Sequence, residues 1–356
     1  AVTFTAWTDR TKLPEKKGDY YLDTDVTLSS TWMPADGTTL CLNGHSITMD
    51  NRQADVIYVL PNVSLTLTDC KGENGKYGQI THASGTYGRG VEVENGTFNL
   101  YKGIITGNGG EVTGEKSHLG GGVKMKGDSK FNMYGGSITG NIGGGYCLGG
   151  GVYAAYSSST FNLYGGEISS NSGSSGGVYV VGKFNMTGGI ITGNTANYGG
   201  GVEVRGGAAF NMSGGSITNN TASCNGTSEG GGVFVYDGTF TVSGSANITG
   251  NTANNVYLYD GKTITISEGG LSGTIGVTTA TKPAENKPVT VIAATKGFTG
   301  LTNHVVSDDN AYVTAVDGSA IVLRVVGGGE THTHTYDGTW KYDGTNHWQE
   351  CTDEDC

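Results

Sequence analysis

The sequence predicts an all-β fold, a right-handed parallel β-helix solenoid of about nine coils with a small C-terminal β cap and a short Cys/His tail. A phrase of Phe, Asn and a hydrophobic residue recurs along the chain and is followed by a glycine bend, an Ile and an Asn. Its phenylalanines stand at intervals of 33, 30, 23, 26 and 30 residues, at Phe98, Phe131, Phe161, Phe184, Phe210 and Phe240. Glycine supplies 64 of 356 residues and proline 5, which fits neither collagen nor a disordered Pro/Gly tract.

Each repeat contains three short segments that alternate in hydrophobicity. The copy at 202–217 reads Val-Glu-Val, then Phe-Asn-Met after a glycine bend, then a lone Ile217. Alternation with a period of two indicates β-strands, and three strands per repeat describe one coil of a parallel β-helix. We therefore expect the phenylalanines to share one inward column, with the hydrophobic residues two positions later forming the next column.

An asparagine ends each coil of the repeat region. These residues are Asn108, Asn141, Asn171, Asn194, Asn220 and Asn251. Asparagine tolerates the left-handed backbone conformation better than most residues, so each is expected to adopt it at the turn. Their amides are also expected to hydrogen-bond from coil to coil as a ladder.

The order of the segments divides the chain. We expect an N-terminal cap at 1–19, the β-helix at 20–275, a C-terminal β cap at 276–326, and a Gly hinge with the tail module at 327–356. Solenoids need capped ends because their terminal coils otherwise expose apolar surface. The segment Leu40-Cys41-Leu42 aligns with the Phe-Asn-Met phrase, which places Leu40 in the phenylalanine column.

Charge and hydropathy exclude several partners. Lys and Arg number 21 and Asp and Glu 32, which gives a formal net charge of −11. Binders of nucleic acid and of anionic membrane surfaces carry basic patches instead. No apolar run reaches the ~18 residues of a membrane-spanning helix. We expect a monomer that binds no nucleic acid, inserts into no membrane and needs no cofactor.

The motifs resemble those of large secreted surface proteins of Gram-positive gut anaerobes. The residues that carry the resemblance are Leu40 to His45, the Leu-Thr-Leu-Thr-Asp-Cys of 65–70, the Phe-Asn-Met coils and the His/Trp/Cys tail. Proteins of this kind combine right-handed β-helix regions with small repeated modules and are taken to be adhesins. The resemblance implies an extracellular location at the bacterial cell surface. It also implies a host or dietary glycoprotein, of mucin or immunoglobulin type, or a glycan as partner.

A carbohydrate-active β-helix enzyme, a polysaccharide hydrolase or lyase, is the alternative function. The outward column of the Val-x-hydrophobic strands is expected to read Glu92, Lys124, Tyr153, Tyr179, Glu203 and Phe234. Its two acids are four coils apart, about 19 Å at the strand spacing. Glycosidase carboxylates act at about 5–5.5 Å or 6.5–9.5 Å. With no clustered carboxylates beside an Arg or Lys base either, the sequence predicts a non-catalytic protein.

Aromatic side chains are the predicted partner-binding residues. Tyr101, Tyr134 and Tyr164 take the same outward position in successive coils, and Tyr153, Tyr179 and Phe234 lie on the neighbouring sheet. Aromatic rings give a large contact area at low entropic cost and are enriched in interfaces. The alternative is that they stack to cover the coil below, since tyrosine favours strands.

Cysteine and histidine supply the candidate metal ligands. The tail contains His332, His334, His347, Cys351 and Cys356, residue types that suit a structural zinc ion. A tail that folds without metal around Trp340 and Trp348 is the alternative. Within the solenoid, Cys41 and Cys70 are expected to be neighbours one coil apart and to remain free thiols.

Overall fold

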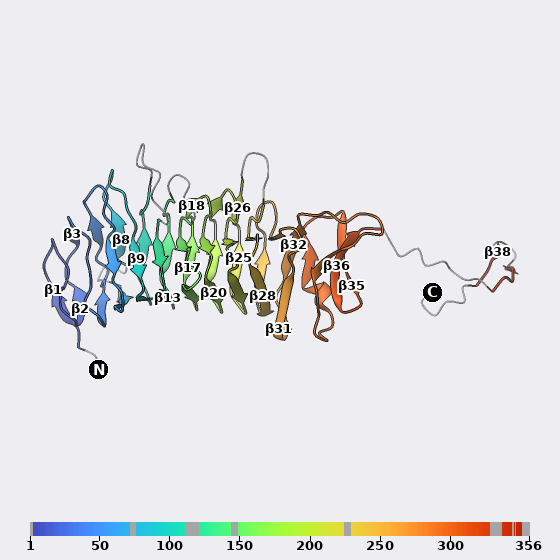
Figure 1. Ribbon diagram of the computed structural model, residues 1–356, viewed down its shortest axis with the longest axis horizontal. Coiled ribbons are helices and arrows are strands. Elements are labelled where there is room, and N and C mark those ends of the chain that lie inside the picture. The colour runs from blue at the N-terminus through green and yellow to red at the C-terminus, as the bar shows by residue number, and fades with distance from the viewer. Residues whose placement is uncertain are drawn as a thin grey trace.

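The computed structural model describes residues 3–71, 76–110, 121–143, 149–223, 229–327, 337–343, 345 and 347–350. Apart from one 3-10 turn, η1 (Leu301–Asn303), the regular elements in these ranges are β-strands. The strands lie side by side in long parallel sheets that run along the long axis of the molecule (Figure 1). The predicted all-β class is confirmed, and the stacking is that of a β-helix-like solenoid.

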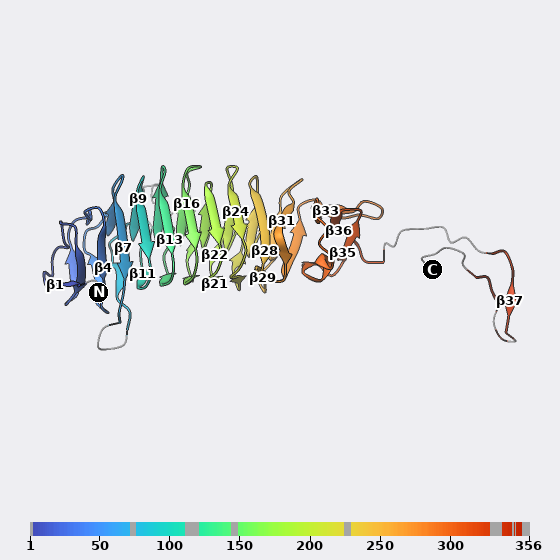
Figure 2. The ribbon, with the colours of Figure 1, turned by 90° about the horizontal axis from the view of Figure 1, so that it is seen from below.

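One face of the solenoid is a 14-stranded sheet, whose strands are seen side by side in Figure 2. In spatial order they are β1 (Thr5–Trp7), β2 (Asp19–Leu22), β4 (Thr38–Cys41), β7 (Ser64–Thr68), β10 (Thr97–Leu100), β13 (Lys130–Met133), β16 (Thr160–Leu163), β20 (Lys183–Met186), β24 (Ala209–Met212), β28 (Thr239–Gly244), β31 (Ile264–Leu271), β33 (Val289–Ile292), β36 (Ala320–Val325) and β35 (Tyr312–Asp317). The Phe-Asn-hydrophobic phrases form its centre.

Two further rows of strands join at one strand, β32 (Ile275–Thr279), to make a 19-stranded sheet. The first row is β3 (Val26–Leu28), β5 (Ile47–Met49), β8 (Gln79–His82), β11 (Ile104–Thr106), β14 (Ser137–Thr139), β17 (Glu167–Ser169), β21 (Ile190–Thr192), β25 (Ser216–Thr218), β29 (Asn247–Thr249), β32 and β34 (Val305–Ser307). The second row is β6 (Ile57–Val59), β9 (Val91–Glu94), β12 (Val123–Lys126), β15 (Val152–Ala154), β19 (Val178–Val180), β23 (Val202–Val204), β27 (Val233–Val235) and β30 (Val256–Leu258), which pairs with β32. The pairings within both rows are parallel.

Two small sheets complete the description. The corners after the coil-end asparagines stack as β18 (Ser172–Gly173), β22 (Thr195–Ala196) and β26 (Thr221–Ala222). In the tail, β37 (Lys341–Tyr342) pairs antiparallel with β38 (His347–Trp348). The C-terminal strands β33, β36 and β35 also pair antiparallel, and β35 and β36 form a hairpin whose turn is Asp317-Gly318. Gly318 has a φ of 57° there, a conformation that favours glycine.

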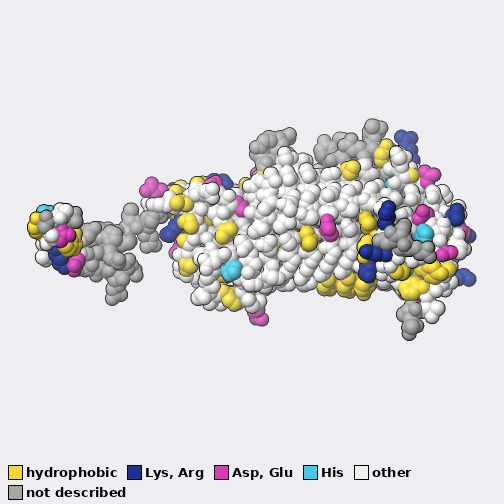
Figure 3. Space-filling view, turned by 180° about the vertical axis from the view of Figure 1, so that it is seen from behind, with side chains coloured by type: hydrophobic (Ala, Val, Ile, Leu, Met, Phe, Trp, Pro, Cys, Tyr) yellow, Lys and Arg dark blue, Asp and Glu magenta, His cyan; other side chains and the backbone are white. Residues whose placement is uncertain are grey.

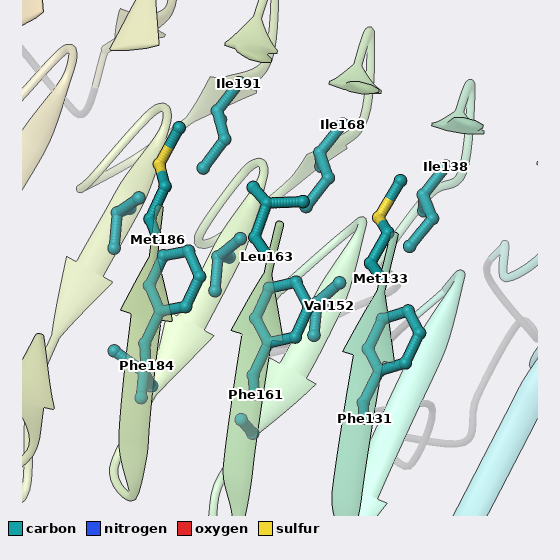
Figure 4. Close-up of a cluster of buried hydrophobic side chains, with 14 of the residues drawn as sticks. Phe131, Met133, Ile138, Val152, Phe161, Leu163, Ile168, Phe184, Met186 and Ile191 are labelled. Carbon is teal, nitrogen blue, oxygen red and sulfur yellow. The ribbon is translucent and has the colours of Figure 1, made fainter. Parts of the chain in front are cut away.

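The core is built from columns of stacked hydrophobic side chains. The register pairs each phenylalanine of the phrase with the next, and all six side chains are fully buried. The rings of Phe131, Phe161 and Phe184 stack 4.9 and 4.8 Å apart, beside a second column that includes Met133 and Leu163 (Figure 4). The predicted inward column is therefore confirmed.

The coil-end asparagines form the predicted ladder but not with the predicted backbone. Asn141 Nδ2 donates to Asn171 Oδ1 at 2.9 Å, and Asn171 Nδ2 donates to Asn194 Oδ1 at 3.0 Å. The left-handed residue is the one before each asparagine, such as Gly140 (φ 64°) or Ser170 (φ 55°). This corrects the expectation: the left-handed turn position is exposed to solvent, whereas a ladder amide such as Asn171 is buried.

The N-terminal alignment is also corrected. Leu40 pairs with Leu67, which pairs with Leu100, so Leu40 lies in the second hydrophobic column rather than in the phenylalanine column. Thr38 takes the phenylalanine position. Seven positions separate Leu40 from Ile47, against five from Met133 to Ile138, so the bend of this coil is two residues longer. The extra length accommodates Leu42, which is fully buried.

Candidate functional site

The exposed tyrosines form a column on the 14-stranded sheet. Tyr101, Tyr134 and Tyr164 directly follow β10, β13 and β16, and they are 46%, 41% and 45% exposed. Backbone hydrogen bonds set their register, as where Tyr134 N donates to Leu100 O at 2.8 Å. A glycine directly follows Tyr134 and Tyr164, and a Cβ at Gly135 would lie 2.5 Å from the carbonyl oxygen of Tyr101. Glycine thus permits the close approach of successive coils at this corner.

The three rings stack on one another and not on the sheet. Ring centroids are 4.5 Å apart between Tyr101 and Tyr134 and 4.9 Å apart between Tyr134 and Tyr164, with interplanar angles of 16° and 10°. Both faces of the Tyr134 ring are therefore covered. Burial by its neighbours, with their charge, raises the pKa of the Tyr134 hydroxyl. The column presents ring edges and a row of hydroxyl groups to solvent, so neither face of the Tyr134 ring is open for a sugar to stack on.

A ladder of amides lies beside the tyrosine column on the same sheet. Its members are Asn99, Asn132, Asn162, Asn185 and Asn211, joined by Nδ2-to-Oδ1 hydrogen bonds of 2.7 to 3.0 Å. Lys130 and Lys183 are exposed at the start of two of these strands. The face is consequently regular, mostly uncharged and rich in groups that hydrogen-bond.

The outward column of the second row has the predicted order. Strand register pairs Glu92 with Lys124, and the column continues through Tyr153, Tyr179, Glu203 and Phe234. The four strand steps between Glu92 and Glu203 match the predicted separation. This column is not an exposed aromatic face, however, because Tyr153 and Tyr179 are each 7% exposed and Phe234 is 1% exposed. The predicted partner contacts of these three residues are corrected to buried packing positions.

Neighbouring side chains cover the C-terminal end of that column. Arg205, Tyr236 and Tyr259 each follow a strand of the second row, one residue past its end. The Arg205 guanidinium lies 4.2 Å from the Tyr236 ring centroid, and the Tyr236 and Tyr259 centroids are 4.6 Å apart. Tyr198 stacks on Phe234 at 5.6 Å. The sequence could have indicated Arg205, Tyr236 and Tyr259, since each comes directly after a Val-x-hydrophobic strand.

Beneath this aromatic cover lies a buried ion pair. The Glu203 carboxylate accepts hydrogen bonds from Arg205 Nε and from Ser175 Oγ. Its side chain is 2% exposed, against 29% for Arg205. Burial raises the pKa of Glu203, although the hydrogen bond from Ser175 and the charge of Arg205 oppose that rise. The pairing makes Glu203 a structural residue of this face.

A charged cluster that the sequence did not reveal is formed by residues of β9 and β12 and by the residues just before β6 and β9. Arg89 Nη1 is 2.6 Å from Glu92 Oε2 and 3.1 Å from Asp55 Oδ2, and Lys124 Nζ is 3.8 Å from Glu92 Oε2. Next to them Lys126 Nζ lies 2.8 Å from Glu94 Oε1. Lys, Arg, Asp and Glu side chains gather towards the N-terminal end of the stack in Figure 3, while the middle of that face is mostly uncharged.

The cluster has perturbed protonation equilibria. Burial raises the pKa of Glu92, while the charges of Arg89 and Lys124 oppose it. Burial together with the charge of Arg89 lowers the pKa of Lys124. Both shifts bring the pKa values closer to neutral pH, as occurs in acid–base sites and also in structural ion networks. The sequence signal was the Val-Glu-Val-Glu of 91–94 paired with the Val-Lys-Met-Lys of 123–126.

The predicted metal ligands fall mostly outside the described residues. His332, His334, Cys351 and Cys356 lie there, and His347 in β38 stacks on Tyr342 with centroids 4.6 Å apart. Among the described residues, no group of three or more His, Cys, Asp or Glu side chains is placed to hold a metal ion. No helix within the described ranges has the length and apolar character needed to span a membrane.

A scan against protein-family models gives no match to the chain, and neither curated proteins nor solved structures match it.

Proposed function

We propose that this chain belongs to a non-catalytic, adhesin-like protein of the bacterial cell surface that binds a glycoprotein or glycan through a rigid β-helix face. In this proposal residues 20–275 form a right-handed stack of about nine coils, and residues 276–326 cap its end. The protein acts outside the cell as a monomer. Its mucin-type or immunoglobulin-type partner is inferred from the resemblance of its motifs to surface proteins of gut anaerobes.

The exposed tyrosine column is the observation that carries the proposal. Three rings that are 41% to 46% exposed lie in a row on strands held by parallel pairing on both sides. Such rings are already ordered before a partner arrives, so little conformational entropy is lost on binding. Tyrosine is enriched in interfaces, so three successive exposed tyrosines support a contact surface on this sheet.

The chemistry of the face favours a partner rich in hydroxyl and amide groups. The tyrosine hydroxyls and the adjacent asparagine amides both donate and accept hydrogen bonds. Stacked rings leave their edges for contact, so the partner would lie across the column and not on a ring face. Glycans and glycosylated peptides offer such hydrogen-bonding groups at short, regular intervals, and the net charge of −11 disfavours nucleic acid.

An array of glycans and mucosal glycoproteins tests the proposal. The double variant Tyr134→Ala with Tyr164→Ala should lose binding, because it removes two of the three rings. Tyr156→Ala is the matched control, since Tyr156 is 41% exposed but lies outside the column. Glu203→Gln should also leave binding nearly unchanged. Full binding by the double variant would refute the role of the column.

The charged cluster favours one second function, a polysaccharide hydrolase or lyase. Glu92 and Lys124 lie 3.8 Å apart, with pKa values shifted in the directions that suit a proton donor and acceptor. Incubation with acidic and neutral polysaccharides would release reducing ends or unsaturated products if this function were present. Turnover that Glu92→Gln abolishes, while the tyrosine variants retain it, would replace the adhesin proposal.

A further inference from the structure

Two cysteines meet at the N-terminal end of the solenoid. Cys41 is the last residue of β4, and Cys70 comes two residues after the end of β7, the next strand in the sheet. The register pairs Cys41 with Thr68, so Cys70 is only two residues further along the chain than the residue opposite Cys41. Leu42 N donates to Thr68 O at 2.9 Å and continues the pairing past the strand end.

A buried carboxylate holds Cys70 at this position. Asp69 is 2% exposed, and its Oδ1 accepts hydrogen bonds from Gly44 N at 3.0 Å and from Lys71 N at 2.7 Å. Its Oδ2 accepts a third bond from Gly78 N at 2.6 Å. These bonds join the bend after Cys41 to the turn after Cys70, where Lys71 has a φ of 59°. Asp69 therefore fixes the segments that carry the two thiols relative to one another.

The thiols share one cavity but differ in accessibility. Cys41 is 2% exposed and Cys70 is exposed, and both line a cavity that Asp69 and Lys102 also border. Both are free thiols. Burial, followed by a hydrogen bond with the Cys70 side chain, raises the pKa of Cys41 to about 12. A thiol with such a pKa is a poor first nucleophile, so reaction with an oxidant begins at Cys70.

We propose that Cys41 and Cys70 are a redox-sensitive pair that closes to a disulfide, with exposed Cys70 as the entry point for a small disulfide such as oxidised glutathione. The Cys70 thiolate attacks one sulfur of oxidised glutathione, forms a mixed disulfide and releases one glutathione thiolate. Cys41 then loses its proton to water, attacks the Cys70 sulfur and releases a second glutathione. Two protein thiols are oxidised and one glutathione disulfide is reduced to two thiols, so the electrons balance.

The cross-link would act on the start of the stack. It would close a loop of 28 residues, from residue 42 to residue 69, and would join two adjacent strands of the 14-stranded sheet. Closing a loop of that length restricts the unfolded chain. β4 and β7 are the third and fourth strands from the N-terminal end of this sheet, and strands near the end of a stack open more readily than those at its centre. The disulfide would therefore stabilise the N-terminal part of the solenoid, independently of what the tyrosine face binds.

The test uses the full chain with Cys147, Cys224, Cys351 and Cys356 replaced by serine. The protein is incubated in a glutathione redox buffer, and peptide mapping by mass spectrometry follows Cys41 and Cys70. We expect one linked peptide that is two hydrogens lighter than the sum of its parts. Hydrogen exchange at β2, β4 and β7 should slow at least ~10-fold in the oxidised protein, and reduction should reverse the change.

Two single variants separate this mechanism from general thiol oxidation. Cys41→Ser should stop at a stable mixed disulfide on Cys70, whereas Cys70→Ser should remain unmodified because Cys41 is buried. A parent protein that accumulates the same mixed disulfide on Cys70 without linkage would overturn the proposal. So would a linked protein whose exchange rates in the N-terminal strands match those of the reduced form.

Discussion

His82 and Asp308 lie at the two ends of one continuous chain of amide hydrogen bonds. His82 Nδ1 is 2.8 Å from Asn108 Oδ1, and Asn255 Nδ2 donates to Asp308 Oδ1 at 2.6 Å. Between them each amide donates to the next, with Nδ2-to-Oδ1 distances of 2.9 to 3.0 Å, through Asn108, Asn141, Asn171, Asn194, Asn220, Asn251 and Asn255. His82 and Asp308 are 226 positions apart in the sequence.

The amide dipoles of this chain all point in the same direction. Their N–H groups face the Asp308 carboxyl group and their oxygens face the His82 ring, so the chain of hydrogen bonds has one polarity from end to end. His82 Nε2 lies 2.8 Å from Ala54 O, which is also an acceptor. Because aligned hydrogen bonds polarise one another, the ladder contributes along the whole solenoid and not to one coil alone.

Removal of a ladder amide should destabilise the protein more than removal of an exposed one. Asn171→Ala takes the acceptor from the backbone N–H of Asn141, which donates to Asn171 Oδ1 at 3.0 Å in a buried site. We expect a loss of about 2–3 kcal/mol in the free energy of unfolding, measured by urea denaturation. Asn185→Ala, in the half-buried outward ladder, should cost less than about 1 kcal/mol because water replaces the amide. Equal losses would contradict the greater importance of the buried ladder.

Truncation of the core column should separate inward from outward aromatic residues. Phe161 is fully buried between Phe131 and Phe184, with ring centroids 4.9 and 4.8 Å away. Phe161→Ala should cost about 3–5 kcal/mol, because a large cavity remains in the middle of the stack. Tyr164→Ala should cost much less, since that ring is 45% exposed and contacts its column on one side. Thermal or urea unfolding of both variants under the same conditions measures the two losses of stability, and equal losses would contradict the inward and outward assignment.

Asp308 should make stability depend on pH. Burial raises its pKa above the usual 3.8, against the hydrogen bonds from Asn255 and Thr278 that lower it. The folded protein therefore binds this proton more tightly than the unfolded chain. The resulting stability is fully present below pH 3.8 and is lost as pH rises through the folded-state pKa.

The variant Asp308→Asn isolates this effect. It loses a hydrogen bond at every pH, so its absolute stability is a poor measure, but its titrating proton is gone. The stability of the parent should fall relative to the variant as pH rises from ~3.5 to ~7. Urea midpoints across that range give the slope, and a difference that stays constant or changes in the opposite direction would argue against a raised pKa.

The Glu203–Arg205 pair should be costly to break and cheaper to replace. Arg205→Met leaves a carboxylate that is 2% exposed and that still accepts a hydrogen bond from the Ser175 hydroxyl. We expect a loss of about 3 kcal/mol, the usual effect of stranding a buried charge. The double variant with Glu203→Gln should recover part of that loss, and a double-mutant cycle measures the coupling. Additive losses would indicate that the pair does not interact.

The periodic pattern by itself determined the stacking and its columns. Each coil repeats the same alternation, so aligning the phrases already placed Phe161 between Phe131 and Phe184 and ordered the outward column from Glu92 to Phe234. Parallel pairing at one strand spacing converts a sequence offset directly into a spatial neighbour. The coil-end amide ladder followed for the same reason, because identical residues at identical positions meet.

Only the tertiary structure decided how the outward surface is covered. Tyr153 and Tyr179 take outward positions of the alternation yet are buried, and their rings stack on one another with centroids 5.2 Å apart. The tyrosine column at Tyr134 faces solvent with its ring edges, since the rings stack on one another. The Leu40 register and the Arg89 cluster likewise depend on bend lengths and on side chains that meet across coils. Alternation along a strand specifies a direction for each side chain, but not what other part of the chain lies there.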